Sequence, residues 1–234
     1  MKNIYSQIIK NKKQGKKSLA VLLDPDMYDK LPQIIYQIKK IQPDWLFAGG
    51  SMVQNNHLDK MILQIKKKCN IPIFLFPGNN TQISINADAL LFLSLISGRN
   101  PEFLIGQHVI AAPILAKSKL EIIPTGYILV ENGKTTSVEY ISQTKPIPRD
   151  KADIALATAL AGEMLGMKMI YLEAGSGAAK PVPAKLIKKV SKNLHIPLIV
   201  GGGIRNKKQM KKAFEAGADI VVIGTAIEKG QFTG

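Results

Sequence analysis

Short runs of apolar residues alternate along the chain with longer segments in which apolar residues recur at helical spacing. Continuous apolar runs of this length are typical of strands buried on both faces of a parallel sheet. They predict eight strands, over residues 18–24, 44–50, 71–78, 88–95, 121–130, 168–177, 196–203 and 218–226. The helical spacing predicts helices over residues 30–41, 56–68, 101–117, 150–166, 183–193 and 206–217, with Pro113 able to kink the third of them.

Eight strand–helix units in 234 residues predict a single (β/α)8 barrel over residues 1–234. A doubly wound open sheet is the alternative. Between the third and fourth strands lies only "NNTQISINA", which is too short and too polar for a crossover helix. We therefore expect the helix after strand three to be degenerate or missing, which leaves part of the barrel's flank uncovered. Few residues follow the last strand, so the closing helix should be very short or absent.

Glycines and polar residues gather where the predicted strands end, in "LLDPD", "FAGGS", "LFPGN", "YLEAGSG", "VGGGIR" and "IGTA". Active sites of such barrels lie at this rim, and the loops after strands seven and eight commonly hold a phosphate on backbone N–H groups. We expect Gly202, Gly203, Gly224 and Thr225 to form that cup, closed by the glycine-rich stretch 175–177. Tight turns alone are the alternative, but three glycine clusters on neighbouring strands favour a site for a phosphate monoester.

Two acidic residues at strand ends are candidates for chemistry. Asp24 ends the first strand, where a carboxylate can hold Mg²⁺ together with substrate phosphates, and Ser51 can add an oxygen. A turn role before Pro25 is the alternative for Asp24, and Asp26 is a weaker candidate. Glu173 ends the sixth strand among apolar residues, an environment that can raise its pKa and make it a general base; pairing with a lysine or arginine is the alternative.

The chain carries a net charge of +15, but only three of its 32 basic residues are arginine. Nucleic-acid readers favour arginine, so we expect no nucleic-acid partner. Two explanations of the positive charge remain: a solvated lysine-rich surface, or loose contact with an anionic membrane. The single cysteine excludes an internal disulfide and points to the cytoplasm. The N-terminus lacks the apolar core of a signal peptide, and no run is suited to span a bilayer.

The strand-end motifs, in this order and spacing, resemble the geranylgeranylglyceryl phosphate synthases and their heptaprenylglyceryl relatives. "GGGIR" alone recurs in many phosphate-binding barrels, whereas "YLEAGSG" together with "LLDPD" is specific. The resemblance covers nearly the whole chain, and "LFLSLISGRNPEFLIGQH" and "PTGYILV" are similar to the larger, archaeal-type subgroup.

The resemblance implies a Mg²⁺-dependent prenyltransferase that joins sn-glycerol 1-phosphate to a polyprenyl diphosphate, with geranylgeranyl as the expected prenyl group. It implies Asp24 and Ser51 as metal ligands. It implies substrate contacts from Tyr171, Leu172, Glu173, Ala174, Gly175, Ser176, Gly177, Gly202, Gly203, Gly224 and Thr225. The prenyl tail needs an apolar groove, which the uncovered flank near strands three and four can provide. We also expect a homo-oligomer.

Two other functions share some of these features. A barrel isomerase or aldolase acting on a sugar phosphate would use the same cup without an apolar groove. No lysine ends a predicted strand, which argues against a Schiff-base aldolase. A non-enzymatic basic barrel that binds nucleic acid or lipid headgroups is the third reading.

Overall fold

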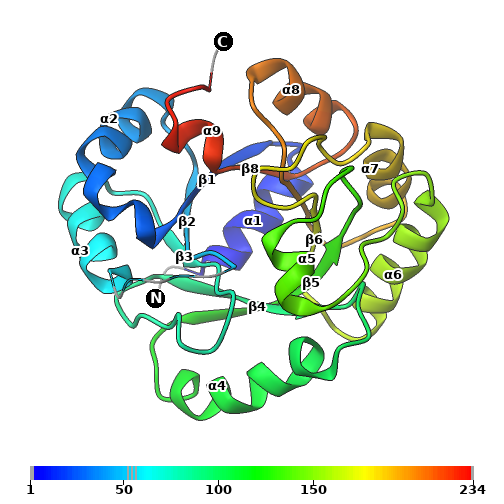
Figure 1. Ribbon diagram of the computed structural model, residues 1–234, viewed down its shortest axis with the longest axis horizontal. Coiled ribbons are helices and arrows are strands. Elements are labelled where there is room, and N and C mark those ends of the chain that lie inside the picture. Colours follow the sequence, from blue (N-terminus) through cyan, green and yellow to red (C-terminus); the bar gives the residue numbers. More distant parts are fainter. Residues whose placement is uncertain (1–2, 52, 54, 56, 233–234) are drawn as a thin grey trace.

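The computed structural model of the protein describes residues 3–51, 53, 55 and 57–232. Within it, eight parallel strands form a closed barrel in sequence order from β1 to β8, and β1 pairs with β8 to complete the ring (Figure 1). The strands are β1 Ser18–Leu23, β2 Trp45–Ala48, β3 Ile73–Leu75, β4 Ala89–Leu95, β5 Glu121–Leu129, β6 Met169–Glu173, β7 Leu198–Gly201 and β8 Ile220–Ile223. All eight lie within the predicted ranges, so the predicted barrel is confirmed and the open sheet is excluded.

Helices surround the strands (Figure 1). The α-helices are α1 Ile4–Lys13, α2 Leu31–Ile41, α3 Leu58–Lys68, α4 Gln107–Leu115, α5 Ser137–Ser142, α6 Ala152–Met164, α7 Ala184–Ser191, α8 Lys207–Glu215 and α9 Thr225–Glu228. A 3-10 helix, η1 (Pro25–Lys30), precedes α2, and a π-helix, η2 (Glu102–Gly106), precedes α4. The helix predicted over 101–117 is thus divided at Gly106, and α4 continues through Pro113. The sequence pattern did not predict α1 or α5.

The flank at β3 and β4 departs from a regular barrel, as predicted. Residues 76–88 form turns and bends with no helix, and β3 pairs with β4 through two residue pairs only. By contrast, β4 pairs with β5 through seven. Figure 1 shows α2 and α3 on one side of the barrel and α6 and α7 on the other, with α4 beyond β4. The helix that would cover the barrel beside β3 is therefore absent. At the other end of the chain, the closing helix α9 is a single turn.

Side chains alternate between two apolar layers, because successive residues of a strand point to opposite faces. Phe47, Phe74 and Tyr171 belong to the cluster inside the barrel. Leu46 and Leu172 belong to the cluster between the strands and the helices. The interior is thus a packed core that supports whatever lies at the two rims. In the described part of the chain, no helix is long and apolar enough to cross a membrane.

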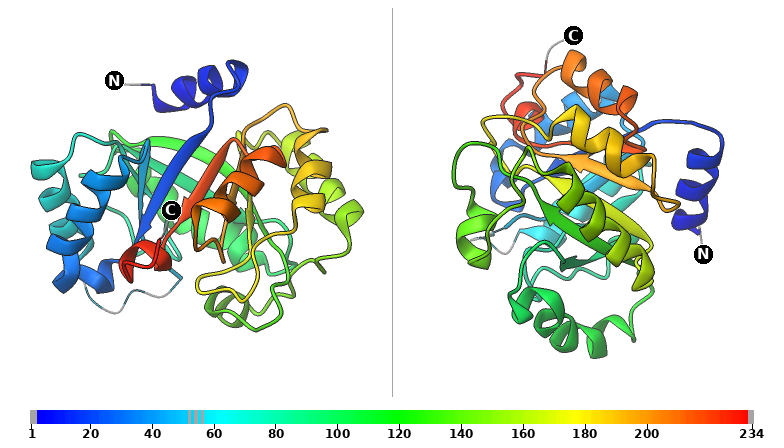
Figure 2. Two further views of the ribbon diagram at one scale, coloured as in Figure 1. Left: turned by 90° about the horizontal axis from the view of Figure 1, so that it is seen from above. Right: turned by 90° about the vertical axis from the view of Figure 1, so that its right-hand side faces the viewer.

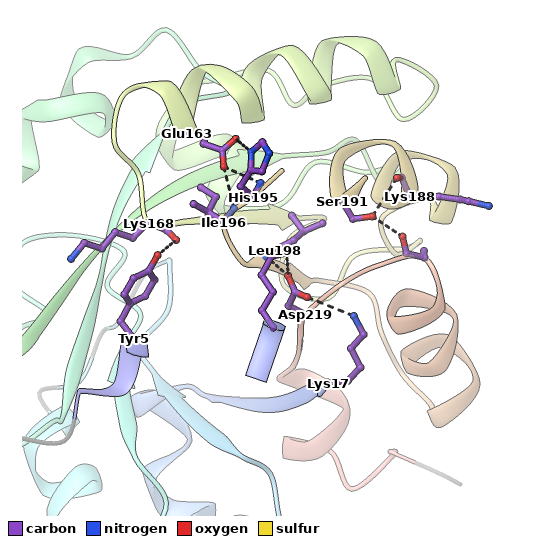
Figure 3. A network of polar contacts seen from close by, with 12 residues as sticks. Tyr5, Lys17, Glu163, Lys168, Lys188, Ser191, His195, Ile196, Leu198 and Asp219 are labelled. Atoms are coloured by element: carbon purple, nitrogen blue, oxygen red, sulfur yellow. Dashed lines mark hydrogen bonds and ion pairs between the residues drawn. The ribbon is translucent and has the colours of Figure 1, made fainter. Parts of the chain in front are cut away.

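The N-terminal ends of the strands are closed and held together by polar contacts. Figure 2 shows α1 across this end of the barrel and α9 at the opposite end. Asp219 accepts the amide of Leu198 at 2.9 Å and pairs with Lys17, while Glu163 accepts the amide of His195 at 2.9 Å (Figure 3). His195 therefore lies at the rim away from the predicted site, as expected. Contacts of this kind stabilise the barrel and leave the C-terminal rim for function.

Candidate active site

A cavity of about 380 Å³ opens at the C-terminal rim of the barrel, where the predicted site residues converge. Eleven of them line it: Asp24, Ser51, Tyr171, Glu173, Gly175, Ser176, Gly177, Gly202, Gly203, Gly224 and Thr225. These residues come from the ends of β1, β2, β6, β7 and β8 and the loops that follow. The barrel therefore brings together residues up to about 200 positions apart.

Leu172 and Ala174 are placed differently from the other residues of the "YLEAGSG" stretch. Both are buried in the layer between the strands and the helices, and their side chains do not form part of the cavity wall. The reason is the alternation of side chains along β6, which turns Tyr171 and Glu173 inward and Leu172 and Ala174 outward. Their side chains therefore lie outside the cavity wall, and the expected contact of these two residues with substrate stays a prediction.

Glycines form the cup at β6, β7 and β8, and at the end of β7 there is no room for side chains. Gly202 has a φ of +82°, and a Cβ there would lie 2.3 Å from Glu173 Oε1. A Cβ on Gly203, whose φ is +70°, would lie 2.9 Å from the backbone of Lys180 and Pro181. At Gly224 a Cβ would meet only ordinary contacts, 3.5 Å from Leu22. Packing within the fold therefore requires glycine at Gly202 and Gly203. At Gly224 the fold would accept a larger residue, and the reason for a glycine there is the space it leaves in the cavity.

Hydroxyl groups and cations surround the cup. Ser176 Oγ and Thr225 Oγ1 face each other across it at 3.4 Å. Arg205 lines the cavity and donates to the carbonyl of Ala178 at 2.8 Å. A Cβ on Gly177 would lie 3.9 Å from Lys134 Nζ, so this exposed ammonium group lies near the glycine-rich loop at the edge of the cup. Backbone amides, hydroxyls and two cations together suit a phosphate.

Glu173 is buried at the end of β6, with one carboxylate oxygen already engaged. Its Oε1 accepts the amide of Gly175 at 2.5 Å. Burial raises the pKa of Glu173 to about 7, although the Gly175 amide opposes that rise by stabilising the carboxylate. No salt bridge links Glu173 to a lysine or arginine within the described residues. The ion pair considered as the alternative role of Glu173 is therefore absent among those residues, and the group can exchange a proton near neutral pH.

Tyr171 lies beside Glu173, and its buried hydroxyl makes no hydrogen bond of standard geometry in the described part of the chain, although it lies close enough to the Glu173 carboxylate to lower the pKa of that group. A Cβ on Gly201 would lie 2.2 Å from this hydroxyl and 3.0 Å from Glu173 Oε2, so the two groups share one small space. Burial and the charge of Glu173 raise the pKa of Tyr171 well above its ordinary value. The phenol stays protonated and can donate to a ligand in the cavity.

Asp24 follows β1, the strand that pairs with β8 at the cup, and it lies close to two oxygen-bearing groups. A Cβ on Gly50 would lie 3.7 Å from its carboxylate, so the chain at Gly50 and Ser51 passes directly by. The Asp24 amide donates to Glu228 Oε1 at 3.1 Å. Burial raises the pKa of both carboxyl groups. The charge of Asp24 raises the pKa of Glu228 further, and the charge of Asp26 does the same for Asp24.

The oxygens of Asp24, Ser51 and Glu228 suit a hard cation such as Mg²⁺. The described residues contain no group of three or more His, Cys, Asp or Glu that could hold a metal by itself. Mg²⁺ is commonly bound by one or two carboxylates together with substrate phosphates and water. The donor set therefore fits this ion if the substrate supplies the remaining oxygens.

A second, apolar cavity adjoins the first at the uncovered flank. It lies between the 76–80 segment, β4 and the η2–α4 helix, and it is lined by side chains that include Leu90, Phe103, Ala111 and Leu115. The two cavities share five residues: Gly50, Ser51, Phe76, Tyr127 and Val138. The rings of Phe76 and Tyr127 stack edge to face with centroids 5.9 Å apart. The polar cup and the apolar groove thus adjoin each other at these shared residues.

The comparisons with known proteins agree with this arrangement. The model of the PcrB family matches residues 7–232. The chain belongs to the PcrB family. One similar protein is geranylgeranylglyceryl phosphate synthase of Flavobacterium johnsoniae, which is 53% identical over 96% of this chain and 93% of that protein. The protein of the same name from Korarchaeum cryptofilum is 44% identical over 91% of this chain and 88% of its own.

A solved structure from Thermoplasma acidophilum is similar over the whole barrel. It is (S)-3-O-geranylgeranylglyceryl phosphate synthase in complex with sn-glycerol-1-phosphate. It has a TM-score of 0.91 and 32% identity to this chain, and it covers 98% of this chain and 93% of its own. The family resemblance found in the sequence is confirmed, which favours a prenyltransferase over an isomerase, an aldolase or a non-enzymatic barrel.

Sequence reasoning missed four residues of the site: Lys134, Arg205, Glu228 and Tyr127. Glu228 reaches the cavity from a one-turn helix, and Lys134 lies near its edge on a loop; no periodicity marks either segment. Arg205 ends the motif "VGGGIR", so the sequence could have indicated it as a cation next to the glycine cup. The alternation of side chains along β5 could have predicted that Tyr127 points into the barrel, once that strand is placed beside β6.

Proposed function

We propose that this protein transfers a polyprenyl group from its diphosphate to a hydroxyl of sn-glycerol 1-phosphate and releases diphosphate. The observation that carries this proposal is the adjacency of the two cavities: a phosphate cup with Glu173 at its edge adjoins an apolar groove. A sugar-phosphate enzyme needs the cup alone. Only a substrate with a long apolar tail makes use of both.

The cup takes the glycerol phosphate. The backbone at Gly177, Gly202 and Gly224 and the hydroxyls of Ser176 and Thr225 surround the phosphate, and Arg205 and Lys134 balance its charge. The buried hydroxyl of Tyr171 lies beside Glu173 in the same space, and it donates to an oxygen of the glycerol. Holding the substrate on fixed groups leaves its free hydroxyl aimed at the groove, and such positioning supplies much of the rate.

The groove takes the prenyl chain, with geranylgeranyl as the expected length. Its walls are apolar, and the diphosphate end reaches the shared residues Gly50 and Ser51, beside Asp24. Asp24 and Ser51 would hold Mg²⁺ there. When bound, this ion would neutralise the departing diphosphate.

Glu173 acts as the general base. As the new C–O ether bond forms and the bond to diphosphate breaks, the glycerol hydroxyl gives up its proton. Glu173 Oε1 is occupied by the Gly175 amide, so Oε2 receives that proton. A base with a pKa of about 7 is matched to this task near neutral pH.

Loose contact with an anionic membrane fits a substrate that partitions into lipid. The outer face of α4 exposes Val109, Ile110 and Ile114 directly behind the groove, and the chain carries a net charge of +15. Apolar side chains with a cationic surround are typical of proteins that rest on lipid surfaces. The homo-oligomer and the cytoplasmic location stay predictions.

Product analysis tests the proposal. The protein is incubated with sn-glycerol 1-phosphate, geranylgeranyl diphosphate and Mg²⁺, and the products are identified by mass. We expect the prenylglyceryl phosphate ether from the wild type and from Asp26→Asn, whose side chain accepts the Asn55 amide. Asp24→Asn should lose most of the turnover while remaining folded. Absence of the ether in the wild type refutes the function, and loss in Asp26→Asn alone shows that the metal site is misassigned.

A further inference from the structure

Glu228 connects the last helix of the described chain to the end of the first strand. It lies on α9, is half-buried and lines the polar cavity. Its Oε1 accepts the backbone amide of Asp24 at 3.1 Å across 204 positions of sequence. The carboxylate of Asp24 is held from another side, because its Oδ1 accepts the amide of Asp26 at 3.0 Å. Glu228 therefore helps to fix the residue expected to hold the cation.

A neutral acceptor would satisfy the Asp24 amide equally well, so the charge of Glu228 needs its own explanation. Two carboxylates side by side in a partly buried cavity repel each other. Lys30 and Lys229 act on Glu228 electrostatically, but neither forms a salt bridge with it or with Asp24 in the described residues. A divalent cation between substrate and protein would remove this repulsion.

We propose that Glu228 is a second carboxylate of the cation site: it positions Asp24 through its amide, and its negative charge raises the affinity of the site for a divalent cation. This inference rests on the proposed function, which places that cation at Asp24. It adds a charged residue that neither "LLDPD" nor its spacing to the other motifs identifies.

The test measures the binding of Mn²⁺ alone to the full chain. The electron paramagnetic resonance signal of free Mn²⁺ reports how much of the ion remains unbound. The variants are Glu228→Gln, which keeps an acceptor for the Asp24 amide but loses the charge, and Glu228→Ala, which loses both. Asp24→Asn is the reference for loss of the site. Glu215→Gln on α8 is the matched control, since Glu215 is exposed and paired with Lys211.

We expect Glu228→Gln to bind Mn²⁺ about 10-fold more weakly than the wild type, as supporting residues of metal sites commonly do. Glu228→Ala should bind at least as weakly, and Glu215→Gln should match the wild type. Thermal melting gives a second readout. Without metal, Glu228→Gln should melt no lower than the wild type because a repulsion is removed. Mn²⁺ should raise the melting temperature of the wild type and of Glu215→Gln alike, and that of Glu228→Gln by less.

The outcomes separate this inference from the function on which it rests. Wild-type affinity in Glu228→Gln, with binding lost in Asp24→Asn, overturns the role of Glu228 and leaves the cation site standing. If Mn²⁺ binding is lost in Glu228→Ala but not in Glu228→Gln, Glu228 only accepts the Asp24 amide, and the proposed role of its charge is equally overturned. If the wild type and Asp24→Asn bind Mn²⁺ alike, the cation site at Asp24 itself is wrong, and the inference falls with it.

Discussion

The two halves of the cavity mouth are built by opposite means. The cup at β6 to β8 is made largely of backbone, which admits no side chain at two of its glycines: a Cβ on Gly175 would lie 2.4 Å from Thr136 Cγ2, and one on Gly202 would lie 2.3 Å from Glu173 Oε1. The groove at β3 and β4 is made of the side chains themselves, from a segment without a helix and from α4. Backbone sites tolerate little change, whereas a wall of side chains can be reshaped.

This difference also separates what each half recognises. A phosphate is small, charged and the same in every substrate, so a rigid ring of amides and hydroxyls suits it. A prenyl chain varies in length and presents no polar group, so only shape and apolar area can select it. Substitutions in the cup should therefore affect all prenyl donors alike, and substitutions in the groove should discriminate among them.

The largest effect is expected at Glu173, on which the cup and the chemistry both depend. Glu173→Gln should lower kcat by about 10²- to 10⁴-fold, the usual contribution of a general base. In the wild type, kcat/KM should rise with pH through about 7, because the base acts when ionised. A pH–rate profile with no rise near 7 would show that Glu173 is not the base.

The same variant has a distinct signature in stability. The carboxyl binds its proton more tightly in the folded chain than in the unfolded chain, so the wild type should lose stability as the pH rises from about 4.5 to about 7. Glu173→Gln has no such loss and should be more stable above pH 7, by up to about 3 kcal/mol. Urea unfolding of both proteins at pH 5 and pH 8 measures this difference. An equal gap at the two pH values would contradict the raised pKa.

The next effect is expected in the groove. Ala111 on α4 is buried and faces the apolar cavity, while Ala112 on the same helix is exposed. Ala111→Phe should lower kcat/KM for geranylgeranyl diphosphate by about 100-fold by filling the groove, with an overpacking cost of about 1–3 kcal/mol. Geranyl diphosphate should be affected far less, and the control Ala112→Phe should leave both unchanged. An equal loss for both donors would place the chain elsewhere.

A smaller effect is expected at Gly224, where the protein has room for a methyl group. Gly224→Ala should raise the KM for sn-glycerol 1-phosphate by about 10-fold, because the added carbon enters the cup. The KM for the prenyl diphosphate should stay within about twofold, since the groove is untouched. Steady-state kinetics with each substrate varied in turn measure both values. Gly202→Ala is unsuitable for this purpose, since its Cβ would displace Glu173 itself.

The smallest effect is expected at the surface. Weak binding to anionic vesicles should disappear at high salt, since exposed charges are screened within about 8 Å at physiological ionic strength. Neutral vesicles should not bind. Co-sedimentation with both kinds of vesicle measures this, and Val109→Ser on the outer face of α4 should weaken the binding further. If vesicle binding does not change with salt concentration or lipid charge, the lysines form only a solvated surface.

The sequence predicted the cup far better than its surroundings, for a physical reason. Gly202, Gly224 and Glu173 stand at strand ends, and the order of strands in a barrel alone brings strand ends together. Glu228 and Lys134 reach the site only through the folded chain, so no local pattern reveals them. The alternation that turns Leu172 outward, by contrast, was readable from the strand. The helix α1 was missed because its apolar residues Ile4 and Ile8 are few and are buried only by packing on the barrel.

The central claim is that the two halves of the mouth bind two different substrates, and hydrogen exchange of the backbone amides tests it most directly. The wild type is labelled with sn-glycerol 1-phosphate alone, then with a non-hydrolysable geranylgeranyl diphosphate analogue alone. We predict that the first slows exchange in peptides covering 174–178 and 224–228 and leaves 103–115 unchanged. The analogue should slow exchange at 76–80 and 103–115 and leave 174–178 unchanged. Protection of the same peptides by both ligands would contradict the division of the mouth into a phosphate cup and a prenyl groove.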